Sequence, residues 1–375
     1  MANPGESALR VRPGCVTPEP PRDLIARIPN RRRSLSRQQT VEGILRGDRA
    51  VLAQAITLIE SSRAADRELA EQIVEDCHPH SGNSIRVGIT GVPGAGKSSV
   101  IERLGAFLIS EHGIGEHGSG KDGQKVAVLA IDPSSQLSGG SILGDKTRMH
   151  SLASSEMAFI RPTPSRGSLG GVAQRTREAM LLCEAAGYRN ILVETVGVGQ
   201  SETAVHEMVD FFLLITLTGA GDELQGIKRG VMEMADLVAI NKADGANQVA
   251  SEKARAETEN ALHYLPKPPT GWTPRALTCS AQTGKGIDEL WNCVLEYTAL
   301  TKANGWFNVN RRNQTRRWMH EIIEQGLRQR FESQPAIRKR MEALEQDVLE
   351  GRTTSFRAAR TLLDLSSGPK PSDTR

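Results

Sequence analysis

The octapeptide GVPGAGKS at residues 91–98 constrains the fold of this chain more than any other segment. It directly follows the apolar run IRVGIT (85–90) and leads straight into a stretch with helical spacing. The pattern G-x-x-x-x-G-K-[ST] between a strand and a helix is typical of a loop that cradles phosphate groups. A chance glycine-rich turn is the alternative interpretation. The strand before the motif, the helix after it and the intact Gly-Lys-Ser favour the phosphate loop.

The residues of this loop are expected to act on a nucleotide in different ways. Its glycines let the backbone curl until successive N–H groups converge on phosphate oxygens, and the following helix adds the positive end of its dipole. Lys97 should reach the β- and γ-phosphates, and Ser98 should offer its hydroxyl to Mg²⁺. The complete set of expected loop contacts is Gly91, Gly94, Ala95, Gly96, Lys97, Ser98 and Ser99.

Short apolar runs between residues 85 and 300 are rich in β-branched and aliphatic residues. Strands of this kind suit a sheet that is buried on both faces, which requires parallel strands and crossover helices. We therefore expect an α/β fold with a doubly wound, mostly parallel sheet of the P-loop type, which binds ligands at the carboxyl ends of its strands. The expected strands are 85–90, 125–131, 157–160, 190–194, 210–217, 236–240 and 276–279, and the expected helices are 97–111, 172–186, 248–263 and 286–300.

The tetrapeptide NKAD (241–244) indicates which base the nucleotide carries. Asp244 can accept hydrogen bonds from the N1–H and the exocyclic amine of guanine, whereas adenine offers no such pair of donors, so a site built this way rejects it. Asn241 would hold the N7 side of guanine, and the stem of Lys242 would lie over the ring. The motif is weak by itself. Its place at a strand end, downstream of a phosphate loop, makes it strong.

The segment CSAQTG (279–284) follows the last expected strand and matches a further base-contacting loop. Ser280 and Ala281 lie in this loop, and the backbone N–H of Ala281 would point at guanine O6. Together with NKAD, this loop favours GTP and GDP over adenine nucleotides.

Two acidic residues at strand ends are candidates for holding magnesium and water. Asp132 ends the second expected strand, and Glu194 ends the fourth. A carboxylate at Glu194 can bind a magnesium water, and the N–H of Gly197 can report loss of the γ-phosphate. The competing interpretation is that each acid only caps a turn.

The segment 139–149 (GGSILGDKTRM) is polar but carries Asp145, Lys146 and Arg148. This composition suits a mobile loop that closes over the phosphates, and a plain surface loop is the alternative. The residue after Gly197 is Val198 rather than a glutamine that could orient the attacking water. Hydrolysis should therefore be slow without help, since a group supplied by a partner can be worth about 10³–10⁵ in rate.

Composition excludes several other classes of protein. The net charge is only +3, so the chain as a whole is not a polycation that binds nucleic acid. Residues 301–340 hold ten Lys or Arg against three Glu, which suggests an anionic partner or, more simply, a solvated helical face. Scattered cysteines and the lack of a long apolar run favour a reducing compartment without a membrane span. We expect the cytoplasm, or the mitochondrial matrix if the source is eukaryotic.

Taken together, the motifs resemble those of the methylmalonyl-CoA mutase-associated GTPases (MeaB/MMAA type, formerly labelled ArgK). The resemblance extends from about Val41 to Trp318. It is carried by GVPGAGKS, VAVLAIDPSSQLSGGSILGDKTRM, RPTPSRGSLGG, ILVETVGVGQSE, LTGAGDELQGIK and NKADG.

This resemblance implies a GTPase chaperone that assists an adenosylcobalamin-dependent acyl-CoA mutase, methylmalonyl-CoA mutase by default, in cofactor loading and protection from inactivation. It implies that Asp132, Asp145 and Glu194 surround Mg²⁺ and the γ-phosphate, with Ser98 as a further metal ligand. It also implies that Asp222, Gln225 and Lys228 couple the nucleotide state to the partner. Lys97, Asp132, Asp145, Glu194 and Lys228 are then the expected catalytic group.

The resemblance also implies an organisation into parts. We expect a Pro- and Arg-rich tail (1–40), a helical N-terminal extension (41–84) and a GTPase domain (85–300). A C-terminal helical arm (301–365) that forms a homodimer and a disordered tail (366–375) follow.

Three other functions stay open at this stage. A metal-insertion GTPase would need His-rich tracts or Cys pairs, whereas this chain has eight scattered His and no CxxC. A kinase or ATPase linked to amino-acid transport conflicts with NKAD. A GTP-binding scaffold that hydrolyses nothing is compatible with the motifs, because hydrolysis here can require a partner.

Overall fold

The computed structural model describes residues 35–110, 124–132, 149–164, 169–195, 201–219 and 229–366. The chain from Arg37 onward forms one compact unit. Its sheet consists of β1 (Ile85–Gly91), β2 (Val126–Asp132), β3 (Ala158–Pro164), β4 (Asn190–Thr195), β5 (Phe211–Leu217), β6 (Leu237–Asn241) and β7 (Arg275–Thr278). Within the described residues every strand pair is parallel, in the order β3-β2-β4-β1-β5-β6-β7. The expected doubly wound α/β sheet is confirmed.

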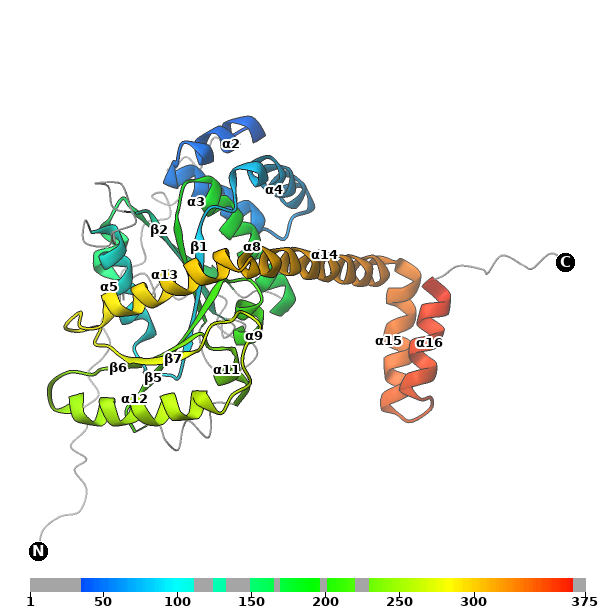
Figure 1. The fold of residues 1–375 in the computed structure, drawn as a ribbon. Helices are drawn as coiled ribbons and strands as arrows, with labels where there is room; N and C mark the ends of the chain where they lie inside the picture. Colours follow the sequence, from blue (N-terminus) through cyan, green and yellow to red (C-terminus); the bar gives the residue numbers. More distant parts are fainter. Residues whose placement is uncertain are drawn as a thin grey trace, which may run out of the picture. The chain divides into compact units, whose positions relative to one another are not determined.

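Strand β1 lies near the middle of the sheet (Figure 1), between β4 and β5. Ile89 pairs in register with Glu194 of β4 and with Leu213 of β5, so the carboxyl ends of these three strands meet at one edge. The apolar runs that predicted the strands are buried on both faces, as parallel strands between helices require.

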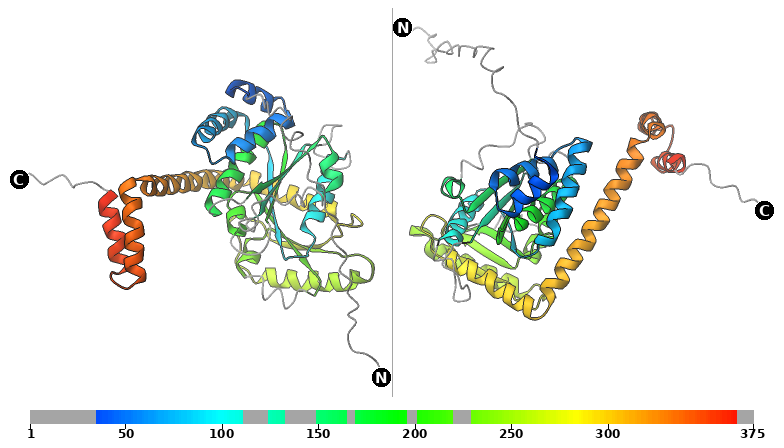
Figure 2. Two further views of the ribbon diagram at one scale, coloured as in Figure 1. Left: turned by 180° about the vertical axis from the view of Figure 1, so that it is seen from behind. Right: turned by 90° about the horizontal axis from the view of Figure 1, so that it is seen from above.

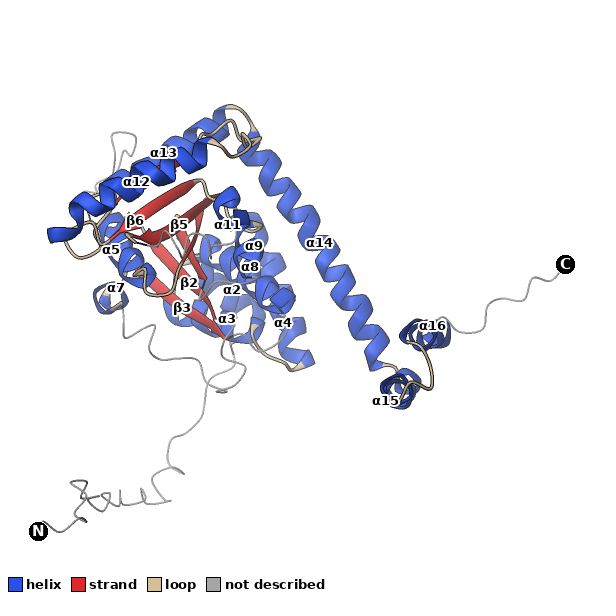
Figure 3. Ribbon diagram, turned by 90° about the horizontal axis from the view of Figure 1, so that it is seen from below, coloured by secondary structure: helices blue, strands red, loops and turns tan. Residues whose placement is uncertain are grey.

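Helices cover the two faces of the sheet in separate layers (Figure 3). One layer consists of α5 (Lys97–Ile109), α12 (Gln248–His263) and α13 (Ile287–Ala303), with the short α7 (His150–Ser154) beside α5. The other includes α8 (Leu169–Ala185) and α9 (Ser201–His206). The short α11 (Arg229–Met234) contacts α9 and β5. Each layer forms its own apolar core against the sheet.

The N-terminal extension, expected as a helical region over 41–84, folds as three helices. They are α2 (Arg37–Leu45), α3 (Arg49–Ile59) and α4 (Ala64–Cys77), followed by the 3-10 turn His78–His80. Asp48 separates the first two, because its carboxylate accepts hydrogen bonds from the N–H groups of Ala50 and Val51 and caps α3. Their buried side chains join the core around α8, so the extension packs on the sheet domain.

The C-terminal part consists of α14 (Trp306–Ser333), α15 (Pro335–Leu349) and α16 (Ser355–Ser366) (Figure 2). The first turns of α14 are fixed to the sheet at the amino end of β5, which is the end away from the phosphate loop. Arg311 donates from Nε and Nη2 to the two carboxylate oxygens of Asp210 at 2.8 and 2.7 Å. Helices α15 and α16 form a hairpin with a small core of Ile337, Leu344, Ala358 and Leu362.

Two sequence expectations concern membranes and thiols. Among the described residues, no helix is long and apolar enough to cross a membrane. Cys77, Cys183, Cys279 and Cys293 are free and buried, and burial raises the pKa of Cys279 and Cys293 to about 12. Neutral thiols of this kind are poor nucleophiles and poor metal ligands.

Candidate nucleotide-binding site

The phosphate loop connects the end of β1 at Gly91 to the start of α5 at Lys97. Two of its glycines are required by close neighbours. A Cβ at Gly91 would lie 2.1 Å from the carbonyl oxygen of Ile215, and a Cβ at Gly96 would lie 2.8 Å from Nδ2 of Asn241. Gly96 also has a φ of 82°, which a side chain disfavours. The loop therefore depends on glycine at the positions that the motif requires.

Lys97 folds back over the loop. Its ammonium group donates to the carbonyl oxygens of Gly91 at 2.9 Å and of Val92 at 3.4 Å. Burial lowers the pKa of Lys97, and the negative charges of Glu194 and Glu202 oppose that effect. The ammonium is thus held inside the loop, among the backbone groups that would surround a phosphate.

The predicted magnesium ligands Ser98 and Glu194 lie together. The Ser98 hydroxyl donates to Oε1 of Glu194 at 3.0 Å, and Glu194 is only 3% exposed. A hydroxyl and a carboxylate are the hard oxygen ligands that Mg²⁺ prefers, so these two residues fit the ion. Asp132 is the last residue of β2, beside β4, but its side chain is outside the described part of the structure, as are Asp145, Gly197 and Lys228.

The predicted base loops meet at the ends of β6 and β7. Asn241 donates from Nδ2 to the carbonyl of Ala95 at 2.8 Å, and its Oδ1 accepts the N–H of Ala281 at 3.1 Å. Asp244 receives a hydrogen bond from the Ser280 hydroxyl through Oδ2. In this structure the Ala281 N–H therefore donates to Asn241, and its expected contact with guanine O6 stays a prediction.

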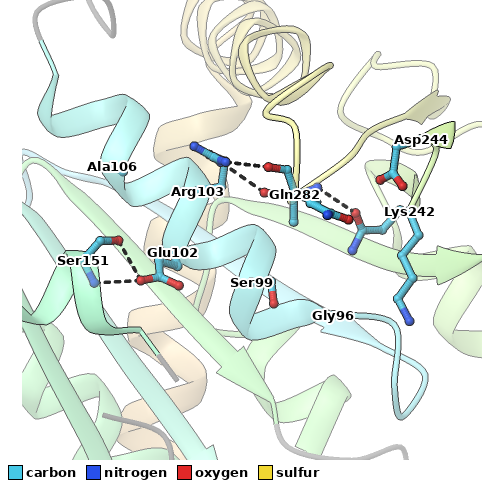
Figure 4. Close-up of a pocket in the computed structure, with 11 residues that line it drawn as sticks. Gly96, Ser99, Glu102, Arg103, Ala106, Ser151, Lys242, Asp244 and Gln282 are labelled. Carbon is cyan, nitrogen blue, oxygen red and sulfur yellow. Dashed lines mark hydrogen bonds between the residues drawn. The ribbon is translucent and has the colours of Figure 1, made fainter. Parts of the chain in front are cut away.

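A cavity of about 540 Å³ joins the phosphate loop to the base loops (Figure 4). Its walls come from α5, the start of α7, the end of β6 and the loop after β7. The lining residues are Gly96, Ser99, Glu102, Arg103, Ala106, Ser151, Asn241, Lys242, Asp244, Ala281 and Gln282. The volume is in the range of small-molecule sites.

Four residues near this site were not predicted. Glu102 accepts from the N–H and the hydroxyl of Ser151 at 2.9 and 2.7 Å, which fixes the start of α7 to α5. Arg103 contacts the base loop. Glu202, buried in α9, acts electrostatically on Lys97. None of them has a local sequence pattern, because only the tertiary fold brings them to the site.

A family model described as methylmalonyl Co-A mutase-associated GTPase MeaB matches residues 52–336. The match covers most of α3, all of α4, the whole sheet and all of α14, and so includes every element of the site. The chain belongs to the MeaB family.

Named relatives agree with membership of the MeaB family. GTPase ArgK of Escherichia coli is 49% identical over 287 residues, covering 76% of this chain and 83% of the relative. The methylmalonic aciduria type A homolog of Mus musculus, a mitochondrial protein, is 44% identical over 331 residues, covering 86% and 77%. A crystal structure titled LAO/AO transport system kinase is 38% identical, with a TM-score of 0.67, and covers 88% of this chain and 97% of that chain.

As a MeaB protein the chain is a P-loop GTPase, and membership of a GTPase family implies that it binds a guanine nucleotide. The cavity in Figure 4 is the candidate site for it. The geometry suits this chemistry, because a lysine and backbone groups face the phosphate end while an aspartate held by Ser280 faces the base end.

Proposed function

We propose that this protein is a GTP-hydrolysing chaperone for an adenosylcobalamin-dependent acyl-CoA mutase, methylmalonyl-CoA mutase in the first instance. Its role is to assist cofactor loading and to protect the mutase from inactivation. The observation that carries the proposal is the match to the mutase-associated family over residues 52–336, and the cavity between the phosphate loop and the base loops supports it.

Different residues of the chain act on different parts of GTP. Lys97 leaves the carbonyls of Gly91 and Val92 to contact the β- and γ-phosphates, where its positive charge offsets charge that develops on the leaving group. Asp244, oriented by Ser280, accepts from N1–H and the exocyclic amine of guanine. Asn241 keeps the two ends of the cleft in register through Ala95.

Ser98 and Glu194 would hold Mg²⁺, with Asp132 and Asp145 as further acidic ligands. When bound, the ion would supply positive charge that offsets the negative charge of the phosphates. Glu194 lies near the end of β4, shortly before Gly197. A change in the contacts of Glu194 would therefore alter the position of the segment that contains Gly197.

Regulation by the partner is inferred from the absence of a glutamine directly after Gly197 in the sequence. Val198 occupies the position after Gly197, where a glutamine would orient the attacking water. Basal hydrolysis is then slow, and the mutase raises it through the segment with Asp222, Gln225 and Lys228.

Assembly as a homodimer completes the proposal. Large apolar side chains of α14 and α16 are exposed in the single chain: Met319, Ile322, Ile323, Leu327, Phe356 and Leu363. Exposed apolar surface of this extent marks an interaction site, and a second copy of the same helical arm is the proposed occupant.

The test is the GTP hydrolysis rate of the purified protein, alone and with the cobalamin-dependent mutase of the same organism. We expect the mutase to raise the rate by about tenfold or more, and Lys97→Ala to abolish hydrolysis in both conditions. Tight GTP binding without stimulation would refute the mutase as client and leave a different client or a scaffold that does not hydrolyse GTP.

The other candidate functions predict different results. A metal-insertion GTPase would respond to Ni²⁺ or Co²⁺ rather than to the mutase. A kinase or ATPase linked to amino-acid transport would use ATP, which Asp244 disfavours.

A further inference from the structure

Arg103 joins the helix that follows the phosphate loop to the loop that contacts the base. It lies in the second turn of α5, and its guanidinium donates from Nε to the carbonyl of Ala281 at 3.1 Å and from Nη2 to the carbonyl of Gln282 at 2.7 Å (Figure 4). One planar cation thus contacts two successive peptide units, a geometry that a point charge such as lysine cannot reproduce.

These two carbonyls depend on Arg103. Among the described residues, no other group donates a hydrogen bond to the carbonyl oxygen of Ala281 or Gln282. The rest of the loop is tied down in other ways, since the N–H of Gly284 donates to the Ser280 carbonyl and the N–H of Thr283 to the Ser280 hydroxyl. Arg103 therefore controls the part of the loop at Ala281 and Gln282, at the mouth of the cavity.

The orientation of this part of the loop determines where the N–H of Ala281 points. The N–H of Ala281 shares its planar peptide unit with the Ser280 carbonyl, which accepts from the N–H of Gly284. On the other side of the same Cα, the Ala281 carbonyl accepts from Arg103, so the two hydrogen bonds together restrict rotation of the N–H. The nitrogen of that N–H now lies 3.1 Å from Oδ1 of Asn241, and both Ala281 and Asn241 line the cavity.

We propose that Arg103 is a positioning residue for guanine recognition, which sets the Ala281 N–H to donate to O6 of the base. It never touches the nucleotide in this role, and it acts on one edge of the base only. Asp244 reads the N1 and N2 positions from the opposite side and is held independently by Ser280. The proposal rests on guanine-nucleotide binding in this cleft and needs no mutase.

The experiment measures dissociation constants of the full-length protein for GDP, 6-thio-GDP and IDP by calorimetry. Sulfur is a weaker hydrogen-bond acceptor than oxygen, so 6-thio-GDP weakens only the contact at position 6, whereas IDP lacks the exocyclic amine that Asp244 reads. For the wild type we expect 6-thio-GDP and IDP each to bind about tenfold more weakly than GDP.

Arg103→Ala should weaken GDP by about tenfold and leave 6-thio-GDP nearly unchanged, so that discrimination at position 6 is lost. Discrimination against IDP should persist in this variant. Asp244→Asn should give the opposite pattern, with loss of discrimination against IDP. Arg103→Lys should fall between Arg103→Ala and the wild type, and Arg328→Ala, an exposed arginine of α14, should match the wild type.

Equal weakening of all three nucleotides by Arg103→Ala would overturn the proposal, because it would mean that Arg103 only maintains the fold of the cleft. Unchanged affinities would overturn it as well. A wild-type protein that fails to bind GDP would refute the nucleotide site itself, which separates that failure from failure of the role of Arg103.

Discussion

Nδ2 of Asn241 donates to the carbonyl oxygen of Ala95 at 2.8 Å, and this buried hydrogen bond links the base loop to the phosphate loop. Asn241 ends β6, whereas Ala95 lies between β1 and α5. The two strands are separated by β5, so the hydrogen bond spans a neighbouring strand. The space that Asn241 occupies explains why position 96 is glycine.

A pair of glycine substitutions tests this explanation. Gly96→Ala and Gly94→Ala both place a side chain at positive φ, which costs about 1–2 kcal/mol each. Only at Gly96 would the new Cβ lie 2.8 Å from Asn241 Nδ2, since nothing lies within 4 Å at Gly94. Gly96→Ala should therefore lose about 1 kcal/mol more, because the buried hydrogen bond is displaced. Thermal unfolding of the nucleotide-free protein measures the difference, and equal melting temperatures would contradict it.

Asp244 should determine the identity of the base. In Asp244→Asn an amide replaces one acceptor oxygen with a donor, which opposes the N–H groups of guanine but suits the 2-oxo group of xanthine. GTP binding should weaken by about 100-fold, and XTP should bind better than GTP. Competition binding with GTP, XTP and ATP checks this, with Asp364→Asn on α16 as a matched control. An unchanged preference for GTP over ATP would refute base reading by Asp244.

Lys228 should act in coupling to the mutase and not in nucleotide affinity. Lys228→Ala is expected to leave the dissociation constant for GTP within about twofold of the wild type and to remove most of the mutase-stimulated hydrolysis. This pattern is typical of losing a charged group that acts only in the transition state. Lys253→Ala, an exposed lysine of α12, is the control. Full stimulation of Lys228→Ala by the mutase would show that Lys228 does not couple the nucleotide state to the partner.

Arg311 should contribute far more to stability than its neighbour Arg317. Asp210 is buried and would lose its charged partner in Arg311→Ala, which costs about 3–5 kcal/mol. Arg317 pairs with Glu207 at the surface, so Arg317→Ala should cost about 1 kcal/mol or less. Urea unfolding measures both changes. The double variant Asp210→Asn, Arg311→Ala should recover part of the loss, because it removes the stranded charge.

Stability should fall as the pH rises from about 4 to about 7 because of Asp236. Burial raises the pKa of this carboxyl to about 7, so between its unfolded pKa of about 4 and that value the folded state binds more protons than the unfolded state. The free energy of unfolding then decreases with pH in this window, by at most about 1.4 kcal/mol per unit. Asp236→Asn should flatten this part of the curve, measured by urea unfolding from pH 4.5 to 8. Glu178, whose pKa burial also raises to about 7, should leave a residual slope that Glu178→Gln removes.

The sheet could be predicted from the sequence because strands such as β4, β5 and β6 are short, mostly apolar runs that are buried almost throughout. The helices α7, α9 and α11 could not, since each is only five or six residues long and has no helical period to read. The split of the N-terminal extension into three helices depends on short breaks such as Gly47–Asp48, and their capping contacts are visible only in three dimensions.

The site was predictable where its residues are consecutive in sequence. Glycine spacing and the Lys-Ser pair identify the phosphate loop, and NKAD identifies the base loop. Arg103 gives no such indication, because an arginine on an exposed helix position is ordinary until the fold brings two carbonyls to it. Glu202 became relevant only when α9 placed its charge near Lys97.

The hairpin of α15 and α16 encloses very few side chains, namely Ile337, Leu344, Ala358 and Leu362. A core of this size is much too small to keep a separate unit folded. Leu349 and Phe356 near the tip of the same hairpin are 82% and 88% exposed. In the proposed homodimer, a second copy that covers these side chains would also stabilise the hairpin by mass action. The stability of the hairpin would then rise with the concentration of the protein, and the hairpin would open before the sheet domain on dilution.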